Sequence, residues 1–187
     1  MAHKPVLFKE VFEYLNPQPG QKFMDATING GGHGLAIAER VGLDGKLLGI
    51  EWDREIFKSL KFKVENSEFK DRIILVNDSY VNLKKIVEEQ NFGEADGVLF
   101  DFGMSSWHLE SGRGFSFQKD EILDMRFSVP VPKLPNVENG SRGTDQRSAP
   151  DNVGTGTSAL EIVNTWPEDE LEKIIKEYGE EGFARQI

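Results

Sequence analysis

A run of glycines that follows a short apolar stretch constrains the fold more than any other feature of the sequence. Residues 23–26 (FMDA) are typical of a strand, and Gly30, Gly31, Gly32 and His33 follow them closely. Glycine permits positive φ angles and lets the backbone approach a ligand, because it carries no Cβ. A second apolar stretch ends at Glu51, whose carboxylate could accept hydrogen bonds from both hydroxyls of a ribose. The sequence therefore predicts a nucleoside cofactor site.

The spacing of the glycines separates two kinds of nucleoside cofactor. A dinucleotide fingerprint, G-x-G-x-x-G, that starts at Gly30 would place its third glycine at Leu35. The loop is more like the glycine loop of enzymes that use S-adenosylmethionine, in which no pyrophosphate has to be held. A glycine turn of an α/β protein that binds no ligand is the alternative, because a single glycine motif is a weak signal.

Patterns typical of strands and helices alternate along the chain. A short amphipathic helix is expected over Pro5–Leu15. Strands are expected at residues 22–26, 46–50, 72–76 and 97–101, and helices at 34–41, 54–65 and 80–90. Connections of this length imply a parallel sheet with right-handed crossovers. Ligands of such sheets bind beyond the carboxyl ends of the strands, where four acidic residues would lie: Asp25, Glu51, Asp78 and Asp101.

The later part of the chain has a different texture. Residues 128–157 contain four prolines and many small polar residues without periodicity, so we expect an irregular, mobile insertion there. Helical patterns return at residues 158–164 and again from Pro167, which precedes acidic residues that suit a first turn. We therefore expect a cofactor-binding core (1–127), an insertion (128–157) and the start of a helical domain (158–187).

Composition limits the partners. The net charge of -10 argues against broad electrostatic attraction to nucleic acid, so an RNA contact would need a local patch or an assembled partner. The chain has no cysteine, which excludes disulfides and thiolate metal sites, and its three histidines show no metal spacing. No stretch suggests a signal peptide or a membrane span. We expect a cytoplasmic protein without a metal or a membrane contact.

Several short motifs occur in one order and together resemble the RsmH/MraW family. They are Pro5–Leu7, the glycine loop ending in His33, Asp101–Ser106 (DFGMSS), Arg113–Phe117 (RGFSF), Leu123–Arg126 (LDMR) and Tyr178–Arg185 (YGEEGFAR). Enzymes of this family use S-adenosyl-L-methionine to methylate the N4 amine of a cytidine in small-subunit (16S) ribosomal RNA. The resemblance implies a Rossmann-like methyltransferase sheet of parallel strands with flanking helices, followed by the start of a helical insertion domain. Ribosomal RNA of the small subunit would be the partner.

The resemblance also implies roles for individual residues. The cofactor contacts would be Gly31, Gly32, His33, Glu51, Tyr80, Asp101 and His108. Tyr80 stands where the family usually has Phe and would lie beside the adenine, whereas His108 stands where the family has Gln. The candidate catalytic residues are Asp101, Ser105 and Ser106. The candidate substrate contacts are Arg113, Phe115, Phe117 and Arg126.

The chemistry of an exocyclic amine leaves several of these roles open. The lone pair of cytosine N4 is delocalised into the ring, and an acceptor for the amino hydrogens helps to localise it. Asp101 could be that acceptor, a cofactor contact, or a cap of the following helix. Ser105 and Ser106 could orient the base or cap a helix. The phenylalanines could equally pack in a core, and Arg126 could form an internal ion pair with Asp124.

The fourth predicted strand would be an edge of the sheet. Family members continue beyond the length of this chain and complete the sheet. We therefore expect either a piece of a family protein or a sheet completed by self-association or by a partner, since an open strand edge invites pairing. The alternative function is a non-catalytic protein that binds S-adenosylmethionine or associates with the ribosome. A nicotinamide oxidoreductase is disfavoured by the glycine spacing.

Overall fold

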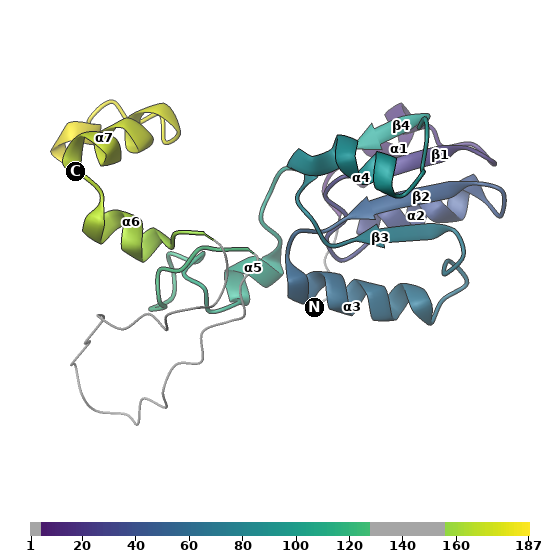
Figure 1. The fold of residues 1–187 in the computed structure, drawn as a ribbon, viewed down its shortest axis with the longest axis horizontal. Coiled ribbons are helices and arrows are strands. Elements are labelled where there is room, and N and C mark those ends of the chain that lie inside the picture. Colours follow the sequence, from purple (N-terminus) through teal and green to yellow (C-terminus); the bar gives the residue numbers. More distant parts are fainter. Residues whose placement is uncertain (1–4, 128–155) are drawn as a thin grey trace, which may run out of the picture. The chain divides into compact units, whose positions relative to one another are not determined.

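The computed structural model describes residues 5–127 and 156–187, and the chain divides into two compact units, Met1–Ser106 and Trp107–Ile187. The first unit contains, in chain order, α1 (Phe8–Leu15), β1 (Lys22–Asp25), α2 (Gly32–Val41), β2 (Lys46–Ile50), α3 (Arg54–Glu65), β3 (Ile73–Val76), η1 (Tyr80–Asn82), α4 (Leu83–Glu89) and β4 (Gly97–Leu99) (Figure 1). The division falls within α5 (Ser106–Glu110), and the second unit continues with α6 (Ala159–Thr165), α7 (Glu168–Glu177) and η2 (Ala184–Gln186).

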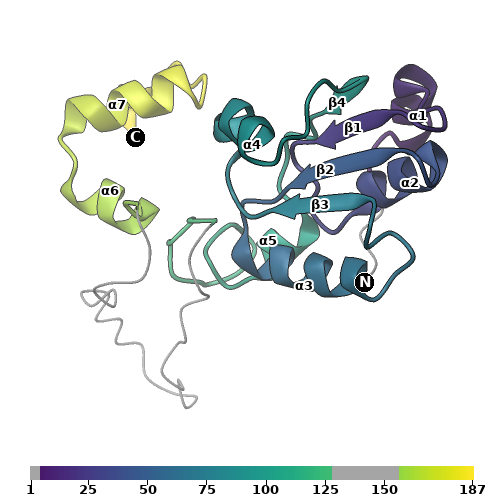
Figure 2. The ribbon, with the colours of Figure 1, turned by 45° about the vertical axis from the view of Figure 1, so that its right-hand side comes forward.

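The four strands form one parallel sheet in the order β3-β2-β1-β4, and Figures 1 and 2 show β3 and β4 at its two edges. Phe23 of β1 lies opposite Leu47 of β2 and Gly97 of β4, and the backbone pairing is parallel throughout. This arrangement confirms the predicted α/β fold with a parallel sheet. β4 is shorter than expected, because it ends at Leu99, and within the described ranges it pairs only with β1.

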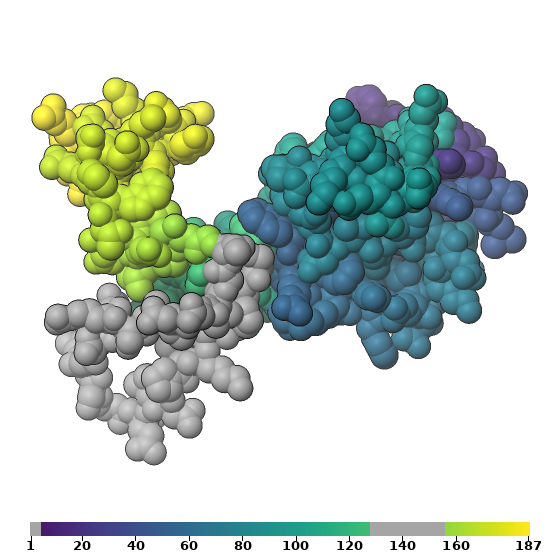
Figure 3. All heavy atoms as spheres, viewed as in Figure 1, coloured from purple at the N-terminus to yellow at the C-terminus, as the bar shows by residue number. Residues whose placement is uncertain are grey.

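The sheet is covered by apolar side chains on both faces. Successive strand residues point to opposite faces, so Phe23 and Leu47 join one core cluster while Met24 and Leu48 join another. The first cluster includes residues of α1, α2 and α3, and the second includes residues of α4. In the space-filling view, residues of α4 and its flanking loops form much of the face of the first unit that is turned to the viewer (Figure 3). Burial on both faces is typical of parallel sheets, and it holds the strand ends in fixed positions.

Within the second unit, backbone hydrogen bonds that the sequence did not predict join α6 to the segment before residue 128. The backbone N–H of Leu160 in α6 donates to the carbonyl of Leu123 at 2.7 Å, and that of Ala159 donates to Asp124 at 3.0 Å. These bonds tie α6 to the segment before residue 128. Residues 107–127, which we expected in the cofactor-binding core, therefore belong to the second unit. The expected insertion, 128–157, lies outside the described residues except at its last two positions.

Across residues 5–127 and 156–187, no helix combines the length and the apolar character that crossing a bilayer requires.

Candidate functional site

The loop after β1 lies between the carboxyl ends of its two neighbouring strands. The backbone N–H of Ala26 donates to the carbonyl of Leu99 at the end of β4, at 2.9 Å. Two residues later, the N–H of Ile28 donates to the carbonyl of Ile50 at the end of β2, at 3.0 Å. The loop therefore extends the sheet pairing to both sides before it turns into α2. This places the glycine turn at the carboxyl edge of the sheet, where ligands of parallel sheets bind.

The glycine turn has open space beside Gly30 and close neighbours beside Gly31 and Gly32. Gly31 has a φ of +83°, and a Cβ there would lie 2.7 Å from Leu60 Cδ1. A Cβ on Gly32 would lie 2.5 Å from Pro5 Cγ, whereas a Cβ on Gly30 would meet nothing within 4 Å. Asn29, just before the turn, has a buried Oδ1 atom with no hydrogen-bond partner among the described residues. An open backbone and an unsatisfied acceptor together suit a bound polar ligand.

Glu51 closes β2 with a carboxyl group that is almost fully buried. Its Oε1 accepts a hydrogen bond from the backbone N–H of Asp53 at 2.7 Å. The side-chain amide of Asn77 donates to its carbonyl oxygen at 2.7 Å and so fixes the backbone. Burial raises the pKa of Glu51 to about 7, although backbone N–H donors partly offset it. The carboxyl group is therefore poised to gain from a ligand that brings hydrogen-bond donors.

Asp25 and Asp101 complete an acidic cluster with Glu51. Asp25 is only 1% exposed, and its Oδ1 accepts from the backbone N–H of Thr27 at 3.2 Å. The pKa of Asp25 is raised to about 7, mainly by burial and less by the negative charges of Asp101 and Glu51, against the Thr27 hydrogen bond, which lowers it. A cation bound beside these three carboxyl groups, which we call the acidic cluster, would favour their charged forms.

His33 connects the first turn of α2 to Asp101. Its Nε2 lies 3.0 Å from the carbonyl oxygen of Val6, so Nε2 carries the hydrogen, because a carbonyl oxygen can only accept. Its Nδ1 lies 4.0 Å from Oδ2 of Asp101. The backbone N–H of Asp101 donates to Thr27 Oγ1 at 2.6 Å, which fixes the loop after β4 against the loop after β1. The carboxylate of Asp101 remains partly exposed at this edge.

Tyr80 lies in η1, beyond the end of β3, and is partly exposed. Its ring contacts those of Phe100 and Phe102 edge-on, at centroid distances of 6.1 and 5.5 Å. The first unit therefore contains six of the seven predicted cofactor contacts, namely Gly31, Gly32, His33, Glu51, Tyr80 and Asp101. Their assignment to a cofactor site and their individual roles stay predictions.

The two candidate serines lie where the units divide. Ser106 is the first residue of α5, and Ser105, which is buried, precedes it at the position of a helix cap. That position suits the capping role that the sequence left open beside base recognition.

Three of the predicted contacts lie inside the second unit. His108 is 3% exposed, and its ring centroid lies 5.9 Å from that of Phe115 and 4.8 Å from that of Phe127. Arg113 is fully buried; its guanidinium donates to the carbonyl oxygens of Arg126 at 3.3 Å and Phe127 at 3.0 Å. The burial of His108, Arg113 and Phe115 favours packing roles in this unit, so their predicted ligand contacts remain predictions.

Phe117 and Arg126 differ from those three. Phe117 is 96% exposed. Arg126 binds Asp124 through two hydrogen bonds, Nε to Oδ1 at 2.7 Å and the second nitrogen to Oδ2 at 2.8 Å. Burial alone would raise the pKa of Asp124, but the hydrogen bonds and charge of Arg126 outweigh it and hold that pKa below its usual value. The internal ion pair that the sequence suggested for Arg126 is therefore present.

Sequence reasoning missed several residues that build the site. The side-chain Oδ1 of Asp53 accepts from the backbone N–H groups of Glu55 and Ile56 at the start of α3, and the backbone N–H of Asp53 donates to the carboxylate of Glu51. An Asp before an amphipathic stretch is a helix-start signal, so this role could have been found. The side chain of Asn77 donates to the carbonyl oxygen of Glu51 at 2.7 Å. The hydroxyl of Thr27 accepts from the backbone N–H of Asp101 at 2.6 Å, and in both pairs the partners are distant in sequence. No local pattern marks such contacts.

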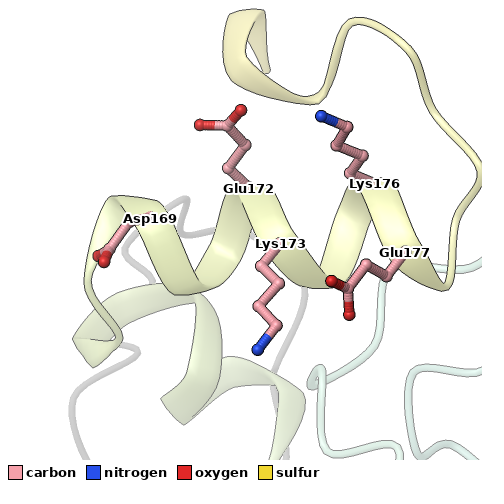
Figure 4. A pocket seen from close by; sticks show the side chains of 5 residues that line it. All are labelled: Asp169, Glu172, Lys173, Lys176 and Glu177. Atoms are coloured by element: carbon pink, nitrogen blue, oxygen red, sulfur yellow. The ribbon is translucent and has the colours of Figure 1, made fainter.

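A further hollow among the described residues contains none of the predicted site residues. A surface hollow in the second unit is lined only by charged residues of α7, whose side chains project from the helix in Figure 4: Asp169, Glu172, Lys173, Lys176 and Glu177. One exposed helix supplies all of them, and none was predicted to bind a ligand. Within the described parts of the chain, no group of three or more His, Asp or Glu side chains could hold a metal ion.

Comparisons with known proteins agree with this geometry. The family model described as the MraW methylase family matches residues 1–132. A ribosomal RNA small subunit methyltransferase H from Dictyoglomus thermophilum is 37% identical over 187 residues, which are 99% of this chain and 54% of the relative. The protein of the same name from a Sulfurihydrogenibium species is 39% identical, over 100% of this chain and 55% of the relative. The chain thus spans about half the length of these curated relatives.

Among solved structures, a fibrillarin from Aeropyrum pernix with natively bound S-adenosyl-L-methionine matches 52% of this chain and 40% of its own. The identity is 15% and the TM-score 0.38, so the likeness is partial. The family match, by contrast, covers the whole first unit and continues into the second. The resemblance carried by the motifs is confirmed, and this chain belongs to the MraW methylase family.

Proposed function

We propose that this chain takes part in methylation of the N4 amine of a cytidine in small-subunit (16S) ribosomal RNA. The observation that carries the proposal is the convergence of the glycine turn and the acidic cluster at one edge of the sheet, in a chain of a methylase family. The names of the relatives support the small ribosomal subunit as the source of the RNA. Such a substrate implies a cytoplasmic location.

The cofactor is S-adenosyl-L-methionine, which supplies a methyl group carried on a sulfonium cation. The open backbone at Gly30 and the unsatisfied Oδ1 of Asn29 suit its polar groups. Glu51, once deprotonated, would accept hydrogen bonds from the ribose hydroxyls. The exposed ring of Tyr80 would lie beside the adenine. The acidic cluster suits a positively charged cofactor better than a neutral one.

Asp101 is the residue of this edge best placed to accept a hydrogen bond from the amine. Its carboxylate is partly exposed, while its backbone is fixed by Thr27 at 2.6 Å. His33 Nε2 donates to the carbonyl oxygen of Val6, so Nδ1, which lies 4.0 Å from Oδ2 of Asp101, carries no hydrogen in the neutral ring and does not compete with the amine for that carboxylate. Methyl transfer depends mainly on such positioning, because donor and acceptor must be collinear and close.

The second candidate function is a non-catalytic protein that binds S-adenosylmethionine. One observation favours it: the candidate RNA contacts Arg113 and Phe115 are buried in the second unit, so these side chains do not offer a surface to RNA. In this function the cofactor site would be retained, and contacts to RNA would come from a partner.

Methyl transfer to small ribosomal subunits that lack the modification separates the two functions. We would incubate the subunits with the chain and radiolabelled S-adenosylmethionine and identify the product nucleoside. N4-methylcytidine formed by the parent chain, and lost in Asp101→Asn but retained in Asp44→Asn, would support the methyltransferase. Asp44 is the matched control because it is exposed on the loop before β2. Cofactor binding without transfer would favour the non-catalytic function.

A partner strand is a further part of the proposal. The outer side of β4 has no paired strand within residues 5–127 and 156–187, and such an edge favours pairing with another chain. We therefore propose a homodimer or a partner that adds a strand there. Sedimentation over a range of concentrations tests the homodimer, and a mass that stays monomeric would exclude it.

A further inference from the structure

Three aromatic rings form an exposed patch at the carboxyl edge of the sheet. Tyr80, Phe100 and Phe102 are 38%, 40% and 71% exposed. Phe100 and Phe102 are stacked at 5.4 Å between centroids, and Tyr80 meets both rings edge-on. We call these three residues the aromatic patch. Its rings come from the segments after β3 and after β4, which are the two edge strands of the sheet.

The charges beside the patch indicate what it can bind. Asp101 lies between Phe100 and Phe102 in sequence, and its carboxylate is partly exposed. Asp78 precedes Tyr80, and its Oδ1 accepts from the N–H of Ser79 at 2.7 Å and from Asn82 at 2.8 Å. Carboxylates repel phosphate groups but accept hydrogen bonds from amines. An aromatic surface flanked by carboxylates therefore suits the ring of an amino-bearing nucleobase rather than the nucleic-acid backbone.

Phe102 is the ring of the patch best placed for the base that is modified. It is the most exposed of the three, and it directly follows Asp101 after β4. The proposed ribose contact, Glu51, follows β2, and β1 separates β2 from β4 in the sheet. The base of the cofactor should lie near its own ribose. The position beside Asp101 is therefore left for a different base.

We infer that Phe102 is a positioning residue that stacks on an unpaired cytosine of RNA and brings its exocyclic amine beside Asp101. The inference rests on the proposed function and deepens it, because it names the surface that receives the target base. A base taken out of a helix loses its stacking partners, and an exposed aromatic ring replaces them. Tyr80 supports the ring of Phe102 from the side, at 5.5 Å.

Binding of free nucleosides tests the inference without any need for catalysis. We would measure saturation-transfer NMR of cytidine and of uridine, with the chain alone and with S-adenosylhomocysteine present. The variants are Phe102→Leu and, as a matched control, Phe62→Leu on α3, because both rings are 71% exposed. We expect Phe102→Leu to weaken cytidine binding about fivefold or more and Phe62→Leu to leave it unchanged. Phe102→Trp should retain binding, and uridine should bind less well, because it lacks the amine.

Three outcomes would overturn the inference. Equal cytidine binding by the parent chain and Phe102→Leu would show that the ring does not stack the base. Displacement of cytidine by S-adenosylhomocysteine would assign the ring of Phe102, like that of Tyr80, to the adenine of the cofactor. Failure of cytidine to bind while S-adenosylhomocysteine binds would remove the inference and leave the cofactor site in place. The reverse result, cytidine binding that depends on Phe102 without cofactor binding, would contradict the proposed function but not the stacking surface.

Discussion

The two units of the chain have different interiors. The first unit is held by apolar side chains on both faces of the sheet, with Ile37, Leu47 and Leu48 completely buried. In the second unit, Arg113, His108 and Asp124 are among the buried residues, and no residue of α6 or α7 is buried. Polar groups in an interior stabilise only when they are paired. Apolar packing can therefore hold a precise site in the first unit, whereas the stability of the second unit depends on specific hydrogen bonds.

The acidic residues show the same contrast. Asp25 and Glu51 are buried in the first unit, and neither forms an ion pair with a cationic side chain of residues 5–127 or 156–187; burial raises the pKa of each to about 7. Asp124 in the second unit is bound by Arg126, so its pKa is lowered despite its burial. A carboxyl group that lacks a cation is unfavourable for folding near neutral pH. Its position at the carboxyl edge of the sheet is therefore best explained by a ligand.

The largest expected effect concerns the apolar core. Leu47→Ala should lower the free energy of unfolding of the first unit by about 2–5 kcal/mol, because it leaves a cavity between the sheet and α2. The exposed Leu43 provides the control variant, Leu43→Ala, which should change stability little. Hydrogen exchange resolves the two units. Loss of protection that extends equally into residues 107–127 would show that the two units fold as one, which would contradict their separate stabilisation.

The next effect is an opposite dependence on pH. Asp25 and Glu51 have raised pKa values in the folded chain, so they bind more protons folded than unfolded. Their contribution favours the folded first unit at about pH 4 and is lost as the pH rises through about 7, by an amount of order 3–4 kcal/mol for each group. Asp124 has a lowered pKa, so its contribution is present near neutral pH and is lost on acidification.

Urea unfolding at several pH values, followed by hydrogen exchange in each unit, measures this difference. Asp25→Asn should flatten the pH dependence of the first unit, because the amide does not titrate. The exposed Asp44 supplies the control, Asp44→Asn. A first unit that becomes more stable between pH 5 and pH 8 in the absence of ligand would contradict the account of the acidic cluster.

A smaller effect is expected from the ion pair of the second unit. Asp124→Asn removes one partner of a bidentate pair and should cost about 1–3 kcal/mol, confined to residues 107–127 and α6. Glu177→Gln, at an exposed position of α7, is a suitable control. If the two variants had equal stability, the ion pair would not stabilise the second unit, and the two units would not differ in the kind of contact that stabilises them.

How well the sequence predicted each unit follows from the same contrast. The strands and their acidic ends were predictable, because an apolar stretch and the residue after it are local in the sequence, as in β2 and Glu51. Arg113 was predicted as a substrate contact but is buried, since its partners are carbonyl oxygens 13 and 14 residues further along the chain. The contact of Tyr80 with Phe102 likewise joins segments that follow opposite edges of the sheet. Periodicity carries no information about such pairs.

Calorimetric titration at pH 6 and pH 8 tests directly whether the carboxyl edge of the first unit binds a cationic nucleoside cofactor. The parent chain should bind S-adenosylmethionine about tenfold more tightly at pH 8, because the cation favours deprotonated carboxyl groups whose pKa is about 7 without it. S-adenosylhomocysteine, which lacks the positive charge, should show a smaller change. Glu51→Gln should weaken binding at least tenfold, and the exposed control Glu65→Gln should not. Binding of S-adenosylmethionine that is independent of pH and unchanged in Glu51→Gln would contradict the account.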